Sequence, residues 1–121
     1  MIQLIYNSST TISAVDVEEM LKVARAKNAI MGITGILLFD GSQFVQLIEG
    51  LDDRIHSLYE SIQSDNRHYD IMTLFVGAID RRDFGKFSML YRSISNLTTD
   101  LPMEDRLNMM LLRTKLLTLK G

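Results

Sequence analysis

The chain has 121 residues, a formal net charge of -2 and 46% hydrophobic residues, which suits one domain with its own core. The charge argues against a large non-specific nucleic-acid surface. The chain has no cysteine, so no disulfide or thiolate metal site is expected. No stretch reaches the ~18 apolar residues of a membrane-spanning helix, and the N-terminus has no signal-peptide pattern. We therefore expect a cytoplasmic protein that binds neither membrane nor nucleic acid.

The first third of the chain predicts a strand followed by a helix. Residues 2–6 alternate as a short strand, and residues 7–11 are interpreted as a polar loop. Ser13 and Asp16 resemble a capping box that opens a helix. The helical spacing of the apolar residues that follow places Asn28 on the buried face, at the end of this helix.

A hairpin follows, and the rest of the fold is organised around it. Residues 36–39 and 44–48 predict two strands joined by an Asp40-Gly41 turn. Both strands are apolar on both faces, as in central strands covered above and below. Gln46 interrupts this pattern with an uncharged amide. A buried amide without a partner costs roughly 1–3 kcal/mol, so we expect Gln46 to have a protein or ligand partner.

The second half of the chain completes an α+β pattern. In order, we predict a helix with Asp52 as its N-cap, a polar turn (64–70), two strands (71–79 and 88–94) and, after Pro102, one helix over 103–119. The resulting order gives a ferredoxin-like sandwich with a mixed five-stranded sheet. Right-handed crossovers put the two early helices on one face, which leaves the other face to a C-terminal helical cap. The last helix is apolar on more than one side, so we expect it to offer a second surface.

Four residues that do not suit a purely apolar core converge in this arrangement: Tyr6, Asn28, Gln46 and Met89. Each alone has an ordinary interpretation as a core aromatic, a helix cap, a backbone-paired amide or a core thioether. Together, on one side of the sheet, they resemble a slot for a flat polar heterocycle.

Three cationic residues are the nearest candidates to contact an anionic tail of such a ligand: Lys27, Arg67 and His68. Each alone is more simply a solvated surface residue. The sequence has no Cys/His ligand spacing, no Ser/His/Asp constellation and no phosphate-binding glycine loop. We therefore expect no metal site.

Several ordered segments resemble one known family. They are Leu-Ile-Tyr-Asn-Ser (4–8), Gly-Ile-Thr-Gly-Ile-Leu-Leu-Phe (32–39) after Asn28, Phe-Val-Gln-Leu-Ile-Glu-Gly (44–50), Asp-Asn-Arg-His (65–68) and Phe-Ser-Met (87–89). Residues 1–95 are thereby similar to the BLUF domain, a blue-light sensor that uses FAD. Residues 96–121 look like the C-terminal helical cap, or output segment, of short BLUF proteins.

The resemblance implies a flavin photoreceptor rather than an enzyme. It implies that FAD, or FMN as the alternative flavin, binds non-covalently between the two early helices. Tyr6 would be the light-driven electron and proton donor, Gln46 the switching amide and Met89 its neighbour. The implied flavin-binding residues are Tyr6, Lys27, Asn28, Phe44, Gln46, Arg67, His68 and Met89. The sequence departs from the family at Phe87, where many members have Trp, and at Lys27, where others have Asn or His.

The red-shifted state would be passed to a downstream signalling protein, and we expect a homo-oligomer or partner contact through the last helix. The alternative function is a small acylphosphatase-like hydrolase on the same sandwich. Such an enzyme would need an Arg in the loop after the first strand, and residues 7–11 contain neither Arg nor Lys. A third possibility, an RNA-binding sheet, lacks the exposed aromatic platform and basic face.

Overall fold

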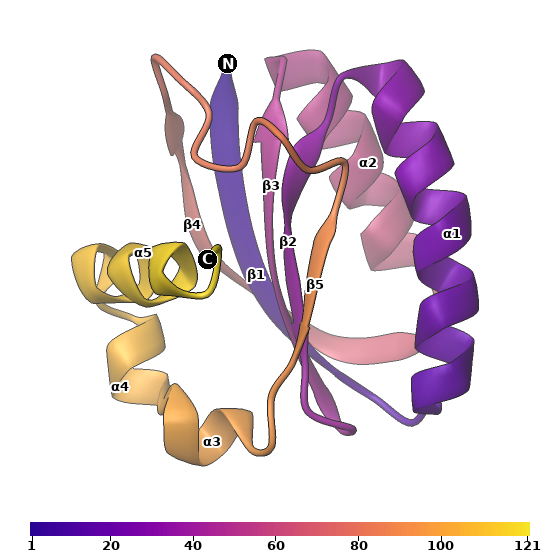
Figure 1. The fold of residues 1–121 in the computed structure, drawn as a ribbon, viewed down its shortest axis with the longest axis vertical. Helices are drawn as coiled ribbons and strands as arrows, with labels where there is room; N and C mark the ends of the chain where they lie inside the picture. The colour runs from indigo at the N-terminus through magenta and orange to yellow at the C-terminus, as the bar shows by residue number, and fades with distance from the viewer.

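The computed structural model describes residues 1–121 and has a five-stranded mixed sheet at its centre (Figure 1). The strands are β1 (Ile2–Thr10), β2 (Thr34–Phe39), β3 (Gln43–Gly50), β4 (His68–Ala78) and β5 (Leu90–Ser93). Their order across the sheet is β4-β1-β3-β2-β5. Only the pairing of β2 with β5 is parallel.

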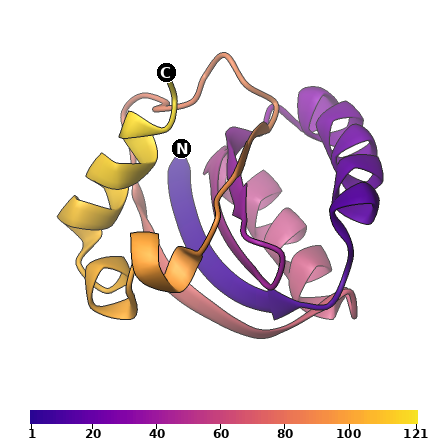
Figure 2. The same cartoon turned by 60° about the horizontal axis from the view of Figure 1, so that its bottom comes forward.

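Helices cover both faces of this sheet. On one side, called the front face here, lie α1 (Ala14–Met31) and α2 (Asp52–Ser64). On the other, the back face, lie α3 (Leu97–Asp100), α4 (Met103–Arg106) and α5 (Met109–Thr118) (Figure 2). This is the expected α+β ferredoxin-like sandwich with a C-terminal cap.

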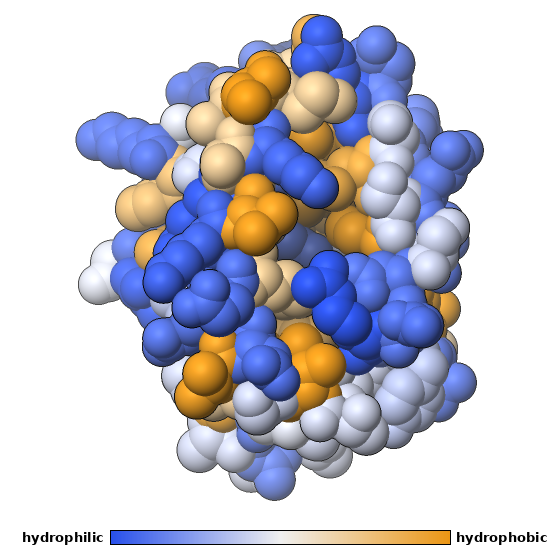
Figure 3. Space-filling view, turned by 90° about the vertical axis from the view of Figure 1, so that its right-hand side faces the viewer, coloured by the Kyte–Doolittle hydropathy of each residue, from blue (hydrophilic) through white to orange (hydrophobic).

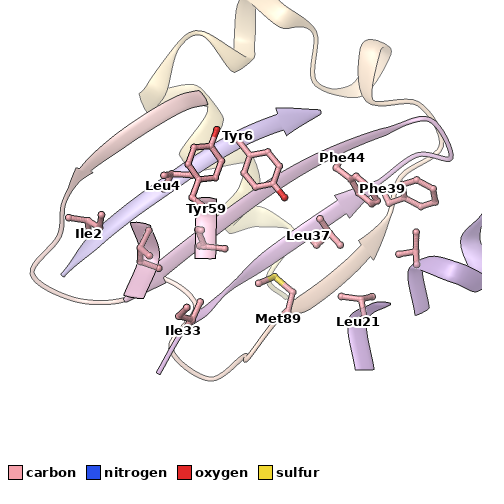
Figure 4. Packing of buried hydrophobic residues seen from close by; sticks show 13 residues of the cluster. Ile2, Leu4, Tyr6, Leu21, Ile33, Leu37, Phe39, Phe44, Tyr59 and Met89 are labelled. Carbon is pink, nitrogen blue, oxygen red and sulfur yellow. The ribbon is translucent and has the colours of Figure 1, made fainter. Parts of the chain in front are cut away.

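Two separate apolar clusters follow from the alternation of side chains along the strands. The front cluster has 13 buried residues, among them Tyr6, Leu37 and Met89 (Figure 4). The back cluster has 10, among them Leu112 and Leu116 of α5. The central strands are apolar on both sides because each side has its own cluster.

Local signals fix two of the chain reversals. The Ser13 side chain accepts a hydrogen bond from the backbone N–H of Asp16 at 3.2 Å and caps α1. In the β2–β3 turn, Asp40 Oδ1 accepts backbone N–H groups of Ser42 and Gln43, at 2.9 and 2.7 Å. Both motifs use a short polar side chain to satisfy backbone donors that have no strand or helix partner.

The first strand is longer than predicted, so the polar loop expected over residues 7–11 is wrong. Residues 7–10 stay in β1 because the strand pairs on both edges, with β3 and with β4. Two of their side chains find partners: Thr10 Oγ1 donates to the carbonyl of Arg67 at 2.6 Å, and Ser8 Oγ lies 3.0 Å from His68 Nδ1. The side-chain oxygen of Asn7 is the one buried polar side-chain atom that has no partner.

The second helix and the later strands differ from prediction at their ends. Leu51, not Asp52, is the N-cap of α2, and it makes no side-chain cap bond. β4 begins at His68, inside the predicted polar turn, and lies at the sheet edge although its sequence is apolar on both faces. β5 is shorter than the predicted 88–94, and Met89 lies just before its first residue.

The single helix predicted over 103–119 is also wrong. The chain forms α4, breaks at Leu107 and starts α5 at Met109, with a further short helix, α3, before Pro102. The break has a local cause, because the Asn108 side chain accepts the backbone N–H of Leu111 at 3.2 Å and caps a new helix. Leu112 and Leu116 face the sheet, while Met110 is 78% exposed.

Candidate functional site

Tyr6, Gln46 and Met89 form a hydrogen-bonded chain on the front face. Tyr6 of β1 lies directly opposite Gln46 of β3 in the strand register. The Tyr6 hydroxyl donates a short hydrogen bond to Gln46 Oε1. Gln46 Nε2 in turn donates to Met89 Sδ at 3.4 Å. Tyr6 and Met89 are 3% and 2% exposed, and Gln46 is partly buried. The structure therefore brings these three predicted residues together.

The Gln46 amide is only partly satisfied in this arrangement. A primary amide has two N–H donors, and a thioether sulfur is a weak acceptor. Gln46 Nε2 has no other hydrogen-bond partner than Met89 Sδ. The amide therefore keeps donor capacity that a ligand with a carbonyl or ring-nitrogen acceptor could use.

The segment that carries Met89 is fixed to α1 by two side chains. Asn28 Nδ2 donates to the carbonyl of Ser88 at 2.8 Å, and Arg25 Nε donates to the carbonyl of Met89 at 2.9 Å. Asn28 is 4% exposed, as expected from the helical spacing. Arg25 was not among the residues predicted for the site, although its position three residues before Asn28 puts the two side chains on neighbouring parts of the helix.

A cavity of about 280 Å³ opens between α1 and α2, at the lower end of the range for small-molecule clefts. Figure 3 looks onto this side of the molecule and shows apolar side chains in its hollow parts. The cavity is lined by Lys27, Asn28, Ile30, Met31, Ile33, Ser57, Leu58 and Ser61. Of the predicted flavin-binding residues, only Lys27 and Asn28 line it.

The cavity does not extend to the Tyr6–Gln46 pair. The front cluster, including Ile33, Leu37 and Tyr59, packs between the two helices and the sheet (Figure 4). The donor set nevertheless suits a flavin ring: an apolar slot with the buried amide of Asn28 at its wall, and the free donor of Gln46 on the same face of the sheet, beyond the cavity. These groups match a flat apolar body with one polar edge.

The aromatic ring of Tyr59 lies next to that of Tyr6. The two ring centroids are 5.4 Å apart, and the Tyr59 hydroxyl shares a 2.6 Å hydrogen bond with Thr73 (Figure 4). Burial raises the pKa of Tyr6 far above its ordinary value. Tyr6 is therefore neutral and retains its proton in the resting protein.

His68 lies next to the same site. Its Nε2 donates to the carbonyl of Ile62 at 2.8 Å, and its Nδ1 is 3.0 Å from Ser8 Oγ. Because a carbonyl can only accept, Nε2 carries the proton and Nδ1 is free to accept from the serine. Burial lowers the pKa of His68, which favours this neutral form. The His68 ring is 6.3 Å from that of Tyr6.

The remaining predicted residues lie at the edges of the site. Phe44 is buried, with its ring 4.9 Å from Phe39 and 6.2 Å from His68. Arg67 pairs with Asp65 at 2.5 Å, and this hydrogen bond raises the pKa of Arg67. The Arg67 side chain is 51% exposed, so the structure does not bring it to the cavity. Its contact with an anionic tail stays a prediction.

No group of three or more His, Cys, Asp or Glu side chains is placed to hold a metal ion. None of the helices is both long enough and apolar enough to cross a membrane.

Comparisons with known proteins agree on one family. The family model for sensors of blue light using FAD (BLUF) matches residues 1–90. The blue light- and temperature-regulated antirepressor BluF of Escherichia coli is 42% identical over 73 residues, which are 60% of this chain and 18% of the antirepressor. The chain thus spans less than a fifth of that relative.

Two solved structures are similar over nearly the whole chain. BlrB, a BLUF protein in its dark state, is 33% identical with a TM-score of 0.76, covering 89% of this chain and 83% of BlrB. The ground state of BlsA is 30% identical with a TM-score of 0.81, covering 96% of this chain and 87% of BlsA. The acylphosphatase-like alternative finds no support among these matches. The chain belongs to the BLUF family of blue-light sensors that use FAD.

Proposed function

We propose that this chain is a blue-light photoreceptor in which Tyr6, Gln46 and Met89 carry the light response, and that it signals through a partner rather than by catalysis. The observation that carries the proposal is the hydrogen-bonded chain from Tyr6 through Gln46 to Met89. An amide at its centre is the one common side chain that presents a donor and an acceptor on one planar head.

Asn28, Lys27 and Phe44 hold FAD in this proposal, with Arg67 and His68 toward its ribityl-phosphate side. When bound, FAD supplies the absorption of blue light and, once excited, an acceptor for an electron. FMN has the same ring system, so the residues around the ring do not discriminate between the two flavins. The partly satisfied amide of Gln46 and the buried amide of Asn28 supply the polar contacts.

Tyr6 is the electron and proton donor. Its hydroxyl already points at Gln46 Oε1, so the proton has a defined acceptor atom when the ring loses an electron. Burial keeps Tyr6 protonated in the dark. The same two features make Tyr6 the natural starting point of the light reaction in this chain.

Gln46 then reverses its amide, by rotation or tautomerisation. In the rotated state Nε2 donates to the Tyr6 oxygen, and Oε1 faces Met89 Sδ, which has no proton to offer. The protein alone loses a hydrogen bond in that state, so the dark orientation is preferred unless a ligand compensates. This imbalance gives a metastable lit state that returns to the dark state without further input.

In this proposal, the C-terminal residues 96–121 transmit the change at the flavin site to another protein molecule. We assign residues 1–95 to flavin binding and 96–121 to output, on a cytoplasmic protein that forms a homo-oligomer or docks a downstream signalling protein. The exposed side chains of Leu107, Met109 and Met110 on the back-face helices support such a contact. The similar antirepressor BluF suggests a protein partner.

The test is a flavin-uptake experiment with light-minus-dark spectra. We expect the purified chain to be yellow, to release FAD on denaturation and to give a reversible red shift under blue light. A chain that stays colourless after incubation with FAD and FMN would contradict the proposal. A chain that binds flavin without any red shift would contradict the roles of Tyr6 and Gln46 alone.

A further inference from the structure

The solvent side of α1 carries a row of apolar residues, most of which neither the fold nor the flavin site explains. Val15, Val23 and Ile30 are 72%, 57% and 83% exposed, and Ala26 lies exposed between them. At about 100° per residue, these four positions fall within an arc of about 80°. The buried residues of α1 lie on the opposite side of the helix: Val17, Leu21 and Asn28.

This row, called the α1 stripe here, runs along the whole of an 18-residue helix. Of its members only Ile30 lines the cavity between α1 and α2. Val15 and Val23 serve no packing within the chain, because both are more than half exposed. Exposed aliphatic side chains on one helix face are typical of a contact surface. Figure 3 shows apolar and charged residues interspersed on this side of the molecule.

The charges on α1 indicate what covers the stripe. The N-terminal half carries Asp16, Glu18 and Glu19, and the C-terminal half carries Lys27, with Lys22 at the middle of the helix. Arg25 is bonded to the Met89 carbonyl and is not part of this pattern. Two such helices repel when parallel and complement each other when antiparallel, because the acidic half of each then lies beside the basic half of the other. A second copy of this chain supplies that pattern without any further partner, and a two-fold symmetric contact needs such a self-complementary surface.

We propose that α1 packs antiparallel against α1 of a second copy and forms a symmetric dimer. With the two-fold axis beside Val23, the two Val23 side chains meet, and Val15 lies beside Ile30 of the other copy. Ala26 then faces Glu19 of the other copy. The Glu19–Lys22 pair within one helix, 3.2 Å long with both side chains largely exposed, exchanges with contacts across the axis at little cost.

This dimer does not depend on the proposed function, because its central residues contact neither the cavity nor Gln46. It also differs from association through α5, which lies on the other face of the sheet (Figure 2). A single helix pair buries little area, so we expect a weak dimer.

The experiment is sedimentation velocity on the full chain over about a hundredfold range of concentration. Val23→Asp should weaken association by about tenfold or more, since two carboxylates then meet at the axis. Ala26→Lys should strengthen the dimer and Ala26→Glu should weaken it, because position 26 faces Glu19 of the other copy. Both substituents are good helix formers, so folding is not at issue.

The matched control uses Gln63, an exposed residue of α2. Gln63→Lys and Gln63→Glu change the net charge as the Ala26 variants do, and should leave association unchanged. A chain that stays monomeric throughout the range overturns the proposal. So does a dimer that tolerates Val23→Asp but dissociates with Met110→Asp on α5, since the contact then lies on the back face. Equal effects of the two Ala26 charges would also overturn it.

Discussion

Two polar residues on β3, Gln46 and Glu49, lie three positions apart and face opposite sides of the sheet, and their surroundings differ sharply. The Glu49 carboxylate, 0% exposed, accepts four hydrogen bonds. The donors are Gln3 Nε2 at 3.2 Å, Thr34 Oγ1 at 3.1 Å and the backbone N–H groups of Asp83 and Phe84 at 3.0 and 2.6 Å. Gln46 has one strong partner, Tyr6, and one weak one, Met89.

This difference in hydrogen-bond partners makes Glu49 a fixed structural group and leaves Gln46 able to change its orientation. A carboxylate only accepts, so Glu49 has no alternative orientation with a reversed pattern, and movement would break all four of its hydrogen bonds. An amide reverses its pattern by rotation, and Gln46 would forfeit only one bond to sulfur. The back face is therefore locked around its buried polar residue, and the front face is not.

The largest expected effect is on the light response of Gln46→Leu. Without the amide, no donor and acceptor can be exchanged, so we expect the red shift to vanish while flavin stays bound. The free energy of unfolding should fall by about 1 kcal/mol, because one buried hydroxyl loses its acceptor. Light-minus-dark spectra and urea unfolding measure the two quantities. A normal red shift in this variant would show that Gln46 is not the switch.

A second complete loss is expected for Tyr6→Phe, which removes the proposed donor. The variant should bind flavin and form no red-shifted state. The excited state of its flavin should live longer, because the electron donor is missing, and transient absorption can record this. The chain has no Trp and four Tyr. Tyr59, whose ring is 5.4 Å from that of Tyr6, is the strongest rival as electron donor, and Tyr91 of β5 is another. A full photocycle in Tyr6→Phe, or its loss in Tyr59→Phe or Tyr91→Phe with flavin retained, would reassign the donor.

For Glu49, the fixed group on the back face, we expect a large effect on the free energy of unfolding and not on the light response. Glu49→Leu removes the acceptor of the Thr34 hydroxyl and of two backbone N–H groups, while Gln3 Nε2 keeps its bond to Asp83. We therefore expect a loss of about 3–5 kcal/mol in the free energy of unfolding. Glu49→Gln keeps the shape of the side chain and one acceptor oxygen, so the free energy of unfolding should fall less than in Glu49→Leu. Urea unfolding monitored by circular dichroism compares both with wild type. A loss below about 1 kcal/mol in Glu49→Leu would remove the contrast with Gln46.

The features that sequence patterns predicted correctly are those with local causes. The Asp40-Gly41 turn and the Ser13 cap depend on side chains two or three residues from the groups they bind. Double-sided apolarity placed β2 and β3 in the centre of the sheet. Apolarity alone does not identify a central strand, because β4 is an edge strand in which apolar residues such as Met72 and Val76 are exposed.

The features that sequence patterns missed depend on partners far along the chain. The polar end of β1 remains a strand only because two neighbouring strands flank it, which the residues 7–10 themselves do not reveal. In the site, the period-two pattern placed Tyr6 and Gln46 on core strands, but their pairing is set by strand register. No sequence pattern singled out Arg25, yet its long side chain reaches the Met89 carbonyl.

The smallest expected effect concerns the attachment of α5 to the back face. Arg113 Nε and Nη2 each donate to the Asp83 carboxylate at 2.9 Å, and Gln3 Nε2 donates to it at 2.8 Å. Asp83 follows β4 and also gives its backbone N–H to Glu49. The locked cluster around Glu49 thus extends to α5 through one bidentate pair.

The hydrogen bond from Arg113 holds the pKa of Asp83 below its ordinary value of 3.8. A carboxyl whose folded pKa is lowered stabilises the fold fully above the unfolded value and loses that contribution as pH falls through the folded value. Arg113→Gln should therefore cost about 0.5–1 kcal/mol near neutral pH, since the Arg113 side chain is 49% exposed and solvent screens the pair. The cost should shrink as the pH falls below 3.8.

Lys115→Gln on the same helix, whose amine is 3.5 Å from Asp105, should cost less at every pH. Urea unfolding across this pH range measures both variants, and a cost of Arg113→Gln that is independent of pH would mean that the Asp83 carboxylate does not anchor α5.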